Sequence, residues 1–99
     1  MIRHIVMFSA KNDNDVPAIE EGLKLLAAIP EHTHFEVSRN LQCDQLGNDI
    51  ALVVYGEFAN EAALARYKAH PLYAEAIRIV RPLRELRIAA DVVAKPAVS

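Results

Sequence analysis

Two short stretches of this chain, residues 2–9 and 50–55, have the pattern of β-strands that are apolar on both faces. In the first, alternate positions place Ile2, His4, Val6 and Phe8 on one face and Arg3, Ile5, Met7 and Ser9 on the other. The second, Ile-Ala-Leu-Val-Val-Tyr, is an unbroken apolar run. Strands of this kind are covered by protein on both sides, so we expect both at the centre of a sheet.

The sequence between these two strands predicts a helix and a further strand. Pro17 suits a first helical turn, and an apolar stripe follows at helical spacing. The stripe consists of Val16, Ile19, Leu23, Leu26 and Ala27. We expect the helix to end at residue 28 or 29, because the residue before Pro30 disfavours helical geometry. Alternating apolar and polar positions over residues 33–41 then predict a strand with one exposed face.

After the second apolar strand, capping and proline positions divide the rest of the chain. Asn60 is a suitable N-cap for a helix that runs to Ala69. Pro71 breaks that helix and begins another helical segment, which continues to about Val80. The last predicted strand spans residues 86–94, where apolar residues alternate with charged ones.

The resulting order is β-α-β-β-α-β, which predicts an α+β, ferredoxin-like domain with a four-stranded antiparallel sheet. In this arrangement the first and third strands are central, and they are the two strands with two apolar faces. A chain of 99 residues has the size of a single domain. We assign residues 1–95 to this domain and residues 96–99 to a loose C-terminal tail.

The second apolar face of the sheet predicts a partner. The helices of a ferredoxin-like domain cover one side only, and Ile5 and Met7 point to the other. Hydrophobic residues form 53% of the chain, a high share for a lone small domain. Because soluble monomers rarely expose a large apolar patch, we predict an obligate homodimer in which two sheets pack face to face around a two-fold axis.

Charge, cysteine content and motifs narrow the classes of function. The 11 basic residues are balanced by 13 acidic ones, so we expect no nucleic-acid partner. The single cysteine, Cys43, cannot form an internal disulfide. No long apolar run indicates a signal peptide or a membrane span, so we expect a cytoplasmic protein without a membrane partner. His32 and His34 are a weak metal signal, and we predict neither a metal nor a cofactor.

Residues 65–73 contain the strongest candidate for a functional site. Tyr67, His70 and Tyr73 follow at three-residue steps around Pro71, where two helical segments meet. His4 lies on the strand face expected to meet these helices, so it can join them in one pocket. Histidine suits general acid or base catalysis near neutral pH, and a tyrosine hydroxyl can donate to an oxyanion. The structural alternative is a hydrogen-bonded core histidine beside packed rings with solvated hydroxyls.

Four arginines recur at every third position near the end of the chain. They are Arg78, Arg81, Arg84 and Arg87. The spacing resembles an anion-binding stripe, but Pro82 interrupts it, and Glu75 and Glu85 reduce its charge. The pattern therefore favours a solvated face or ion pairs at the rim of the subunit interface.

Several segments resemble the stress-responsive A/B barrel domain family, and together they extend over almost the whole chain. They are the opening Ile-Arg-His-Ile-Val-Met-Phe, residues 36–41, the strand at 50–58, Tyr67-x-x-His70-Pro and Arg81-Pro82. Members of this family form dimeric α+β barrels in which two ferredoxin-like sheets pack together. The resemblance thus implies a dimeric α+β barrel, in agreement with the homodimer inferred from the two-faced strands.

The family includes plant stress proteins without established enzymatic activity and olivetolic acid cyclase, a plant polyketide cyclase to which this chain is distantly similar. By this resemblance His4 and Tyr67 match catalytic positions of the cyclase, and His70 matches the histidine of its His-Pro pair. Tyr73 stands where the cyclase has its histidine base. A neutral phenol does not readily take a carbon-bound proton at pH 7, so the resemblance supports the pocket more than the cyclase reaction.

These observations lead to two main functional hypotheses. The first is a homodimer that binds a small aromatic or acyl ligand in a small apolar pocket, without established chemistry. Its predicted ligand contacts are Val6, Phe8 and Tyr73. The alternative is a small-molecule enzyme of polyketide-cyclase-like or lyase type that uses His4 or His70 as acid or base, with Tyr67 orienting the substrate carbonyl. A purely structural or protective assembly is a third possibility.

Overall fold

The computed structural model describes residues 1–95, which form one four-stranded antiparallel sheet and three α-helices. The strands are β1 (Ile2–Ala10), β2 (His34–Arg39), β3 (Leu52–Phe58) and β4 (Arg84–Val93). The helices are α1 (Val16–Lys24), α2 (Glu61–Ala69) and α3 (Pro71–Val80), with short 3-10 helices η1 (Asp13–Asp15) and η2 (Leu25–Ala28) on either side of α1. The strand order β2-β3-β1-β4 confirms the predicted ferredoxin-like α+β fold, with the first and third strands central. The predicted tail at residues 96–99 lies outside the described residues.

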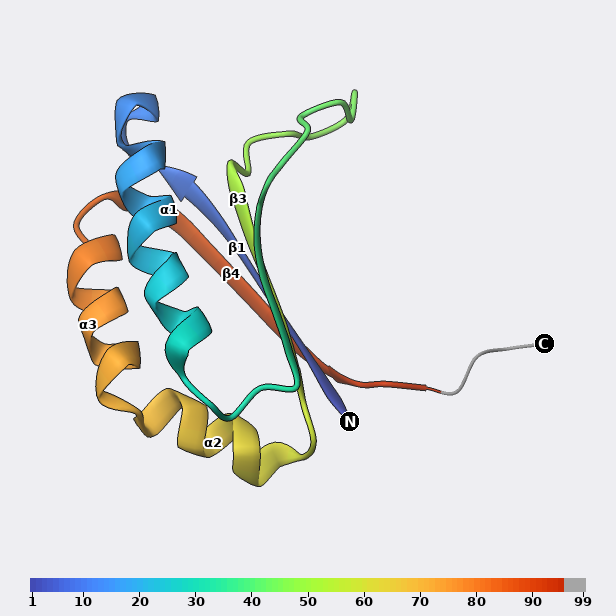
Figure 1. Cartoon of the computed structure of the whole chain (residues 1–99). Coiled ribbons are helices and arrows are strands. Elements are labelled where there is room, and N and C mark those ends of the chain that lie inside the picture. Colours follow the sequence, from blue (N-terminus) through green and yellow to red (C-terminus); the bar gives the residue numbers. More distant parts are fainter. Residues whose placement is uncertain (96–99) are drawn as a thin grey trace.

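The helices lie on one side of the sheet, where α1 and α3 are side by side (Figure 1). The predicted cap of α2 is confirmed, because Asn60 Oδ1 accepts a hydrogen bond from the Ala63 amide at 2.9 Å. The predicted break before Pro71 is also confirmed: His70 is extended and separates α2 from α3. Among residues 1–95, no helix combines the length and the hydrophobicity that are needed to cross a bilayer.

Several predicted boundaries differ from the structure. The strands predicted at residues 33–41 and 86–94 lie at His34–Arg39 and Arg84–Val93. The strand predicted at residues 50–55 lies at Leu52–Phe58. The prediction followed the apolar run, which ends at Tyr55. Gly56 and Glu57 are not part of that run, but they still pair with β1 in the sheet. The first helix changes after Lys24 into the tighter turn of η2. This tightening alters the angular spacing of the side chains, and Ala27 of the predicted stripe is exposed.

The core lies between the helices and the inner face of the sheet, which we define as the face toward the helices. The predicted inward face of β1 is buried, and it carries Ile2, His4, Val6 and Phe8. Central β3 alternates in the same way, with Leu52, Val54 and Phe58 buried. The first strand therefore positions a buried polar residue, His4, against the helices.

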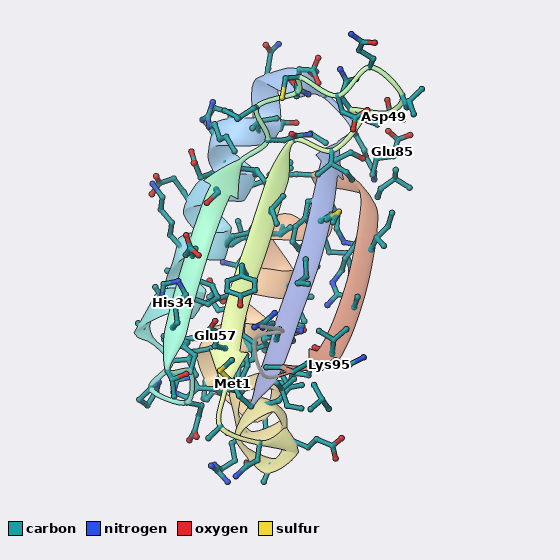
Figure 2. The ribbon with its side chains drawn as sticks, turned by 90° about the vertical axis from the view of Figure 1, so that its right-hand side faces the viewer. Met1, His34, Asp49, Glu57, Glu85 and Lys95 are labelled. Atoms are coloured by element: carbon teal, nitrogen blue, oxygen red, sulfur yellow. The ribbon has the colours of Figure 1, made fainter. Side chains whose placement is uncertain are left out.

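The outer face of the sheet, opposite the helices, is uncovered in the single chain (Figure 2). In the β1–β4 ladder Ile5 is opposite Ala90, and Met7 is opposite Ile88. The apolar surface of β1 thus continues across β4, where Ile88 is 54% exposed. A sheet with this composition on its free face has the pattern of an interface rather than of a solvated surface.

Helices α1 and α3 approach each other closely at Gly22, and this contact gives the first testable prediction. A β-carbon added to Gly22 would lie 2.9 Å from Ile79 Cγ2 and 3.0 Å from Val80 Cγ2. Both neighbours are β-branched and have restricted χ1 angles. We expect Gly22→Ala to lower the free energy of unfolding by about 1 kcal/mol, because overpacking of about 1–3 kcal/mol exceeds the gain in helix propensity of about 1 kcal/mol.

Denaturant unfolding measures this effect. Gly47→Ala is the matched control, since a β-carbon there meets nothing within 4 Å. An increase in stability on Gly22→Ala would contradict the close contact.

Candidate functional site

A cavity of about 40 Å³ lies between the inner face of the sheet and helices α1 and α3. Most of its wall is apolar, and it includes the predicted ligand contacts Val6 and Phe8. The polar side chains in the wall are His4, Tyr67, Tyr73 and Arg87. The fold therefore brings together the strand histidine and the two helical tyrosines that the sequence singled out.

His4 is held in the cavity wall by Asp91, a residue of β4. Its Nδ1 lies 2.5 Å from Asp91 Oδ1, and the two residues are opposite each other in the β1–β4 ladder. A carboxylate accepts the Nδ1–H, which leaves the Nε2 lone pair available. Nε2 has no hydrogen-bond partner within residues 1–95. Over the same residues, every fully buried side-chain nitrogen or oxygen has a partner, so the unpaired Nε2 must keep some accessible surface. Since His4 is 2% exposed, the small accessible surface of Nε2 borders the cavity.

The environment of His4 keeps its imidazole neutral at pH 7. Burial lowers its pKa below the ordinary value of 6.5, and the hydrogen bond to Asp91 opposes part of this effect. The positive charges of Lys68 and Arg87 lower the pKa further. A neutral imidazole with a free Nε2 can accept either a hydrogen bond or a proton from a molecule in the cavity.

The pKa of His4 provides a second testable prediction. An NMR titration of the wild-type protein should give a His4 pKa below 6.5, and Asp91→Asn should lower that pKa further, because the carboxylate stabilises the imidazolium form. His4→Gln assigns the resonance. A His4 pKa above 6.5 in the wild type would contradict the dominance of burial.

The same shift makes stability depend on pH. As the pH falls, His4 of the unfolded chain takes up its proton near pH 6.5, whereas His4 of the folded protein does so at a lower pH. The free energy of unfolding should therefore fall as the pH drops from 6.5 toward the lower folded-state pKa. This slope should be smaller in His4→Gln.

Tyr67 lies at the centre of a group of aromatic rings. Its ring centroid is 4.9 Å from that of Phe58, 5.3 Å from that of Tyr73 and 6.0 Å from that of His4. Burial raises the pKa of Tyr67, so its hydroxyl stays protonated and can donate a hydrogen bond. This hydroxyl also has no partner within residues 1–95, so it is not fully buried. Because Tyr67 lines the cavity, the accessible part of the hydroxyl borders the cavity.

His70, the other predicted catalytic histidine, lies outside the cavity lining. Its Nδ1 accepts a hydrogen bond from the Leu72 amide at 3.1 Å, so its side chain caps the N-terminus of α3. A side-chain acceptor at this position satisfies a helix amide that would otherwise lack a partner. The structure thus gives His70 a capping role, and its acid or base role stays a prediction.

The two histidines of the weak metal signal lie apart from the cavity. His32 stacks on Phe35 with ring centroids 4.9 Å apart, and its Nε2 is 3.3 Å from the Leu26 carbonyl oxygen. His34 pairs with Glu36 at 2.9 Å. Within residues 1–95, no group of three or more histidine, cysteine, aspartate or glutamate side chains is placed to hold a metal ion.

Sequence reasoning did not place Asp91 and Arg87 in the site, because the orientation of the last strand was unknown. The sequence showed that apolar and charged residues alternate in this strand, but not which side faces inward, and the register puts Ile88 beside outward-pointing Met7. The charged side therefore faces inward, with Asp91 beside His4 and Arg87 beside Phe8. The available signal was the presence of a histidine on the buried face of β1, since such a group requires a polar partner.

A family comparison identifies the type of domain. The description of the matching family is "Stress responsive A/B Barrel Domain", and the match extends over residues 2–94. The chain belongs to the stress-responsive A/B barrel domain family. This membership confirms the resemblance seen in the sequence. None of the curated proteins compared with this stress-responsive A/B barrel protein matches it.

Solved structures resemble this stress-responsive A/B barrel protein along almost its whole length. A Dabb family protein from Mesorhizobium loti is 31% identical with a TM-score of 0.79, and the match covers 96% of this chain and 97% of that one. A Thermobifida fusca protein of unknown function, described as dimeric and ferredoxin-like, is 26% identical with a TM-score of 0.80 and coverages of 94% and 90%. A Nitrosomonas europaea protein named as an antibiotic biosynthesis monooxygenase is 16% identical with a TM-score of 0.75 and coverages of 95% and 98%. At this last level of identity the likeness supports the fold alone.

Proposed function

We propose that this stress-responsive A/B barrel protein is a homodimer that binds a small aromatic or acyl ligand in the cavity beside His4 and Tyr67. One observation carries the binding proposal: an apolar cavity holds two unpaired polar atoms of opposite character. The Tyr67 hydroxyl offers a donor, and His4 Nε2 offers an acceptor. A ligand carbonyl fits the first, a ligand hydroxyl fits the second, and an aromatic ring or acyl chain fits the apolar wall.

The homodimer rests on the outer face of the sheet. Ile5, Met7 and Ile88 form part of a continuous apolar surface on β1 and β4. The Thermobifida fusca relative, which has the same fold at 26% identity, is described as dimeric. Packing two such faces together removes both from water and leaves the cavity on the opposite side of each sheet.

The size of the cavity restricts the ligand. A volume of about 40 Å³ is well below the several hundred Å³ typical of sites for drug-sized molecules. The cavity is also smaller than the roughly 150 Å³ of a cavity that binds benzene, so a single ring or a short acyl group enters only when the wall opens, and an extended polyketide would need a far larger opening. Half-buried Tyr73 and exposed Arg87 are the wall residues that can move to admit a ring or acyl group.

Acetophenone is a suitable neutral probe, because it joins one aromatic ring to one carbonyl. We expect it to shift the NMR resonances of His4 and Tyr67, and Tyr67→Phe to weaken its binding about fivefold to tenfold, as for the loss of one hydrogen bond. Tyr55→Phe is the matched control, because the Tyr55 hydroxyl donates to Glu57 at 2.7 Å on the outer face. Equal affinities for the wild type and Tyr67→Phe would refute the donor role.

The His4–Asp91 pair favours a second candidate function, an enzyme that transfers a proton next to a carbonyl. In that reaction His4 Nε2 takes the carbon-bound proton, the carbonyl oxygen becomes an enolate oxygen that accepts from Tyr67, and Asp91 stabilises the imidazolium. We assign the base to His4 rather than His70, because His70 lies outside the cavity lining and caps α3.

Exchange of the acetophenone methyl protons for deuterium in D₂O tests this second function. The protein should accelerate exchange above the buffer rate, and His4→Gln should abolish the acceleration. Acetophenone binding without accelerated exchange would support the binding function and refute the proton-transfer function.

A further inference from the structure

A groove lined by three arginines runs along the mouth of the cavity. It has a volume of about 260 Å³, and its lining consists of Tyr73, Ile77, Arg81, Arg84 and Arg87. Three of these residues, Tyr73, Ile77 and Arg87, also line the cavity. The groove and the cavity therefore share a wall, and one molecule can occupy both.

An irregularity in β4 places two of the arginines on the same side of the strand. Ala10 is opposite Arg84, whereas Phe8 is opposite Arg87, so two residues of β1 span three residues of β4. In a regular strand, residues three apart point to opposite faces. The extra residue of a bulge restores a common face, and both arginines turn toward the inner side with Phe8.

The arginines of the groove have no acidic partner within residues 1–95, in contrast to Arg39, Arg66 and Arg78. Arg78, the first arginine of the every-third-residue pattern, pairs with Glu75. Arg39 and Arg66 also pair with glutamates. The groove lining contains no carboxylate. One polar contact within the lining is long and its acceptor is uncharged: Arg87 Nη2 lies 3.5 Å from the Tyr73 hydroxyl oxygen. The pattern thus divides into one ion-paired arginine and three that converge on one space.

We infer that this groove binds the oxyanion group, a carboxylate or a phosphate, of a ligand whose aromatic or acyl part enters the cavity. The inference rests on the proposed function and names its ligand class as a small amphiphilic acid. Planar guanidinium groups bind carboxylates and phosphates through paired N–H donors. Arg81 at the end of α3 and Arg84 and Arg87 on β4 provide such donors from two elements.

The ligand class also follows from the junction between the two spaces. Arg87 lines the cavity as well as the groove, so an oxyanion held at Arg87 places the atoms next to it at the cavity mouth. The apolar wall formed by Val6 and Phe8 then receives the ring or chain. The inner side of β4 carries this site, and the outer side of the same strand remains available for the dimer.

Benzoate and acetophenone form a matched pair of probes, because a carboxylate oxygen in one replaces a methyl group in the other. At fixed ionic strength we expect benzoate to bind about tenfold more tightly in NMR titrations, as one charge-assisted interaction predicts. Arg84→Gln/Arg87→Gln should remove this advantage. Arg84→Gln alone changes a residue outside the cavity wall, so it should weaken benzoate binding and leave acetophenone binding unchanged within twofold. Phenyl phosphate, titrated in parallel, shows whether a phosphate or a carboxylate is preferred.

Matched variants separate the groove from general charge. Arg78→Gln removes the same charge from α3 outside the groove and should keep the preference for benzoate. Arg81→Gln alters the exposed end of α3 and should weaken benzoate binding even if the double variant proves unstable. Thermal unfolding checks that each variant is folded. Equal binding of benzoate and acetophenone by the wild type, or an unchanged preference in the double variant and in Arg81→Gln, would overturn the inference and leave the proposed function intact.

Inorganic phosphate tests the groove without the cavity. We expect inorganic phosphate to shift the Arg81, Arg84 and Arg87 resonances of the wild type and to leave the Arg81 resonance unshifted in Arg84→Gln/Arg87→Gln. Absence of these shifts in the wild type, or an unchanged Arg81 shift in the double variant, refutes the oxyanion site. If acetophenone and benzoate both fail to shift His4 and Tyr67, the proposed function fails, whatever phosphate does in the groove.

Discussion

Ile88→Glu is expected to convert the proposed homodimer into monomers with the mass of one 11.0 kDa chain. Ile88 lies on the outer face of β4 beside Met7, and both side chains are exposed in the single chain. In a two-fold interface one substitution introduces two carboxylates. Each loses its hydration without gaining a charged partner, which costs several kcal/mol. The dissociation constant should therefore rise about a thousandfold, which corresponds to about 4 kcal/mol.

Sedimentation or light scattering at micromolar concentration measures this change. Ala65→Glu adds the same charge at an exposed position of α2 and should leave the dimer intact. Because folding and association are linked in an obligate dimer, the wild-type unfolding midpoint should rise with protein concentration. A wild-type protein with the mass of one chain, or an Ile88→Glu variant that stays dimeric, would show that the outer face is not the interface.

The elements of the fold that the sequence predicted are those with local causes. Asn60 supplies the acceptor that caps the start of α2. Pro71 can be accommodated only in the first turn of a helix, so it ends α2 and begins α3. The apolar faces of β1 and β3 could be recognised as central, because burial on both sides leaves a continuous hydrophobic run. From these elements the β-α-β-β-α-β order followed, and with it the position of His4 beneath the helices.

The parts of the site that the sequence did not predict depend on strand pairing between segments that are far apart in the chain. Asp91 meets His4 across 87 positions of the chain, and a shift of one residue in the register would move it to the other face. Arg84 and Arg87 share a side because of an irregularity in the β1–β4 ladder. Neither feature has a local signature in an edge strand whose apolar side faces outward. The contact of His70 is local by comparison: its Nδ1 accepts from the Leu72 amide and caps α3, and its acid or base role stays a prediction.

Tyr67→Ala is expected to lower the free energy of unfolding by about 3–5 kcal/mol, as for the loss of a large buried aromatic side chain. Tyr67 is 1% exposed and packs edge to face against Phe58 and Tyr73. Alanine would leave a void between α2 and the sheet that these rings cannot fill without leaving their own contacts. Denaturant unfolding at one fixed protein concentration measures the loss, and Ala62→Gly on the exposed side of α2 reports the smaller cost of a helix-propensity change, about 1 kcal/mol.

Tyr67→Phe separates the packing of this residue from its function. The ring contacts remain, and the hydroxyl that is removed has no partner within residues 1–95, so stability should change by less than about 1 kcal/mol. Acetophenone binding should nevertheless weaken, because the donor at the cavity surface is lost. A large loss of stability in Tyr67→Phe would mean that the hydroxyl has a structural partner. In that case the cavity would lose its donor, and His4 Nε2 would be the one unpaired polar atom left to orient a ligand.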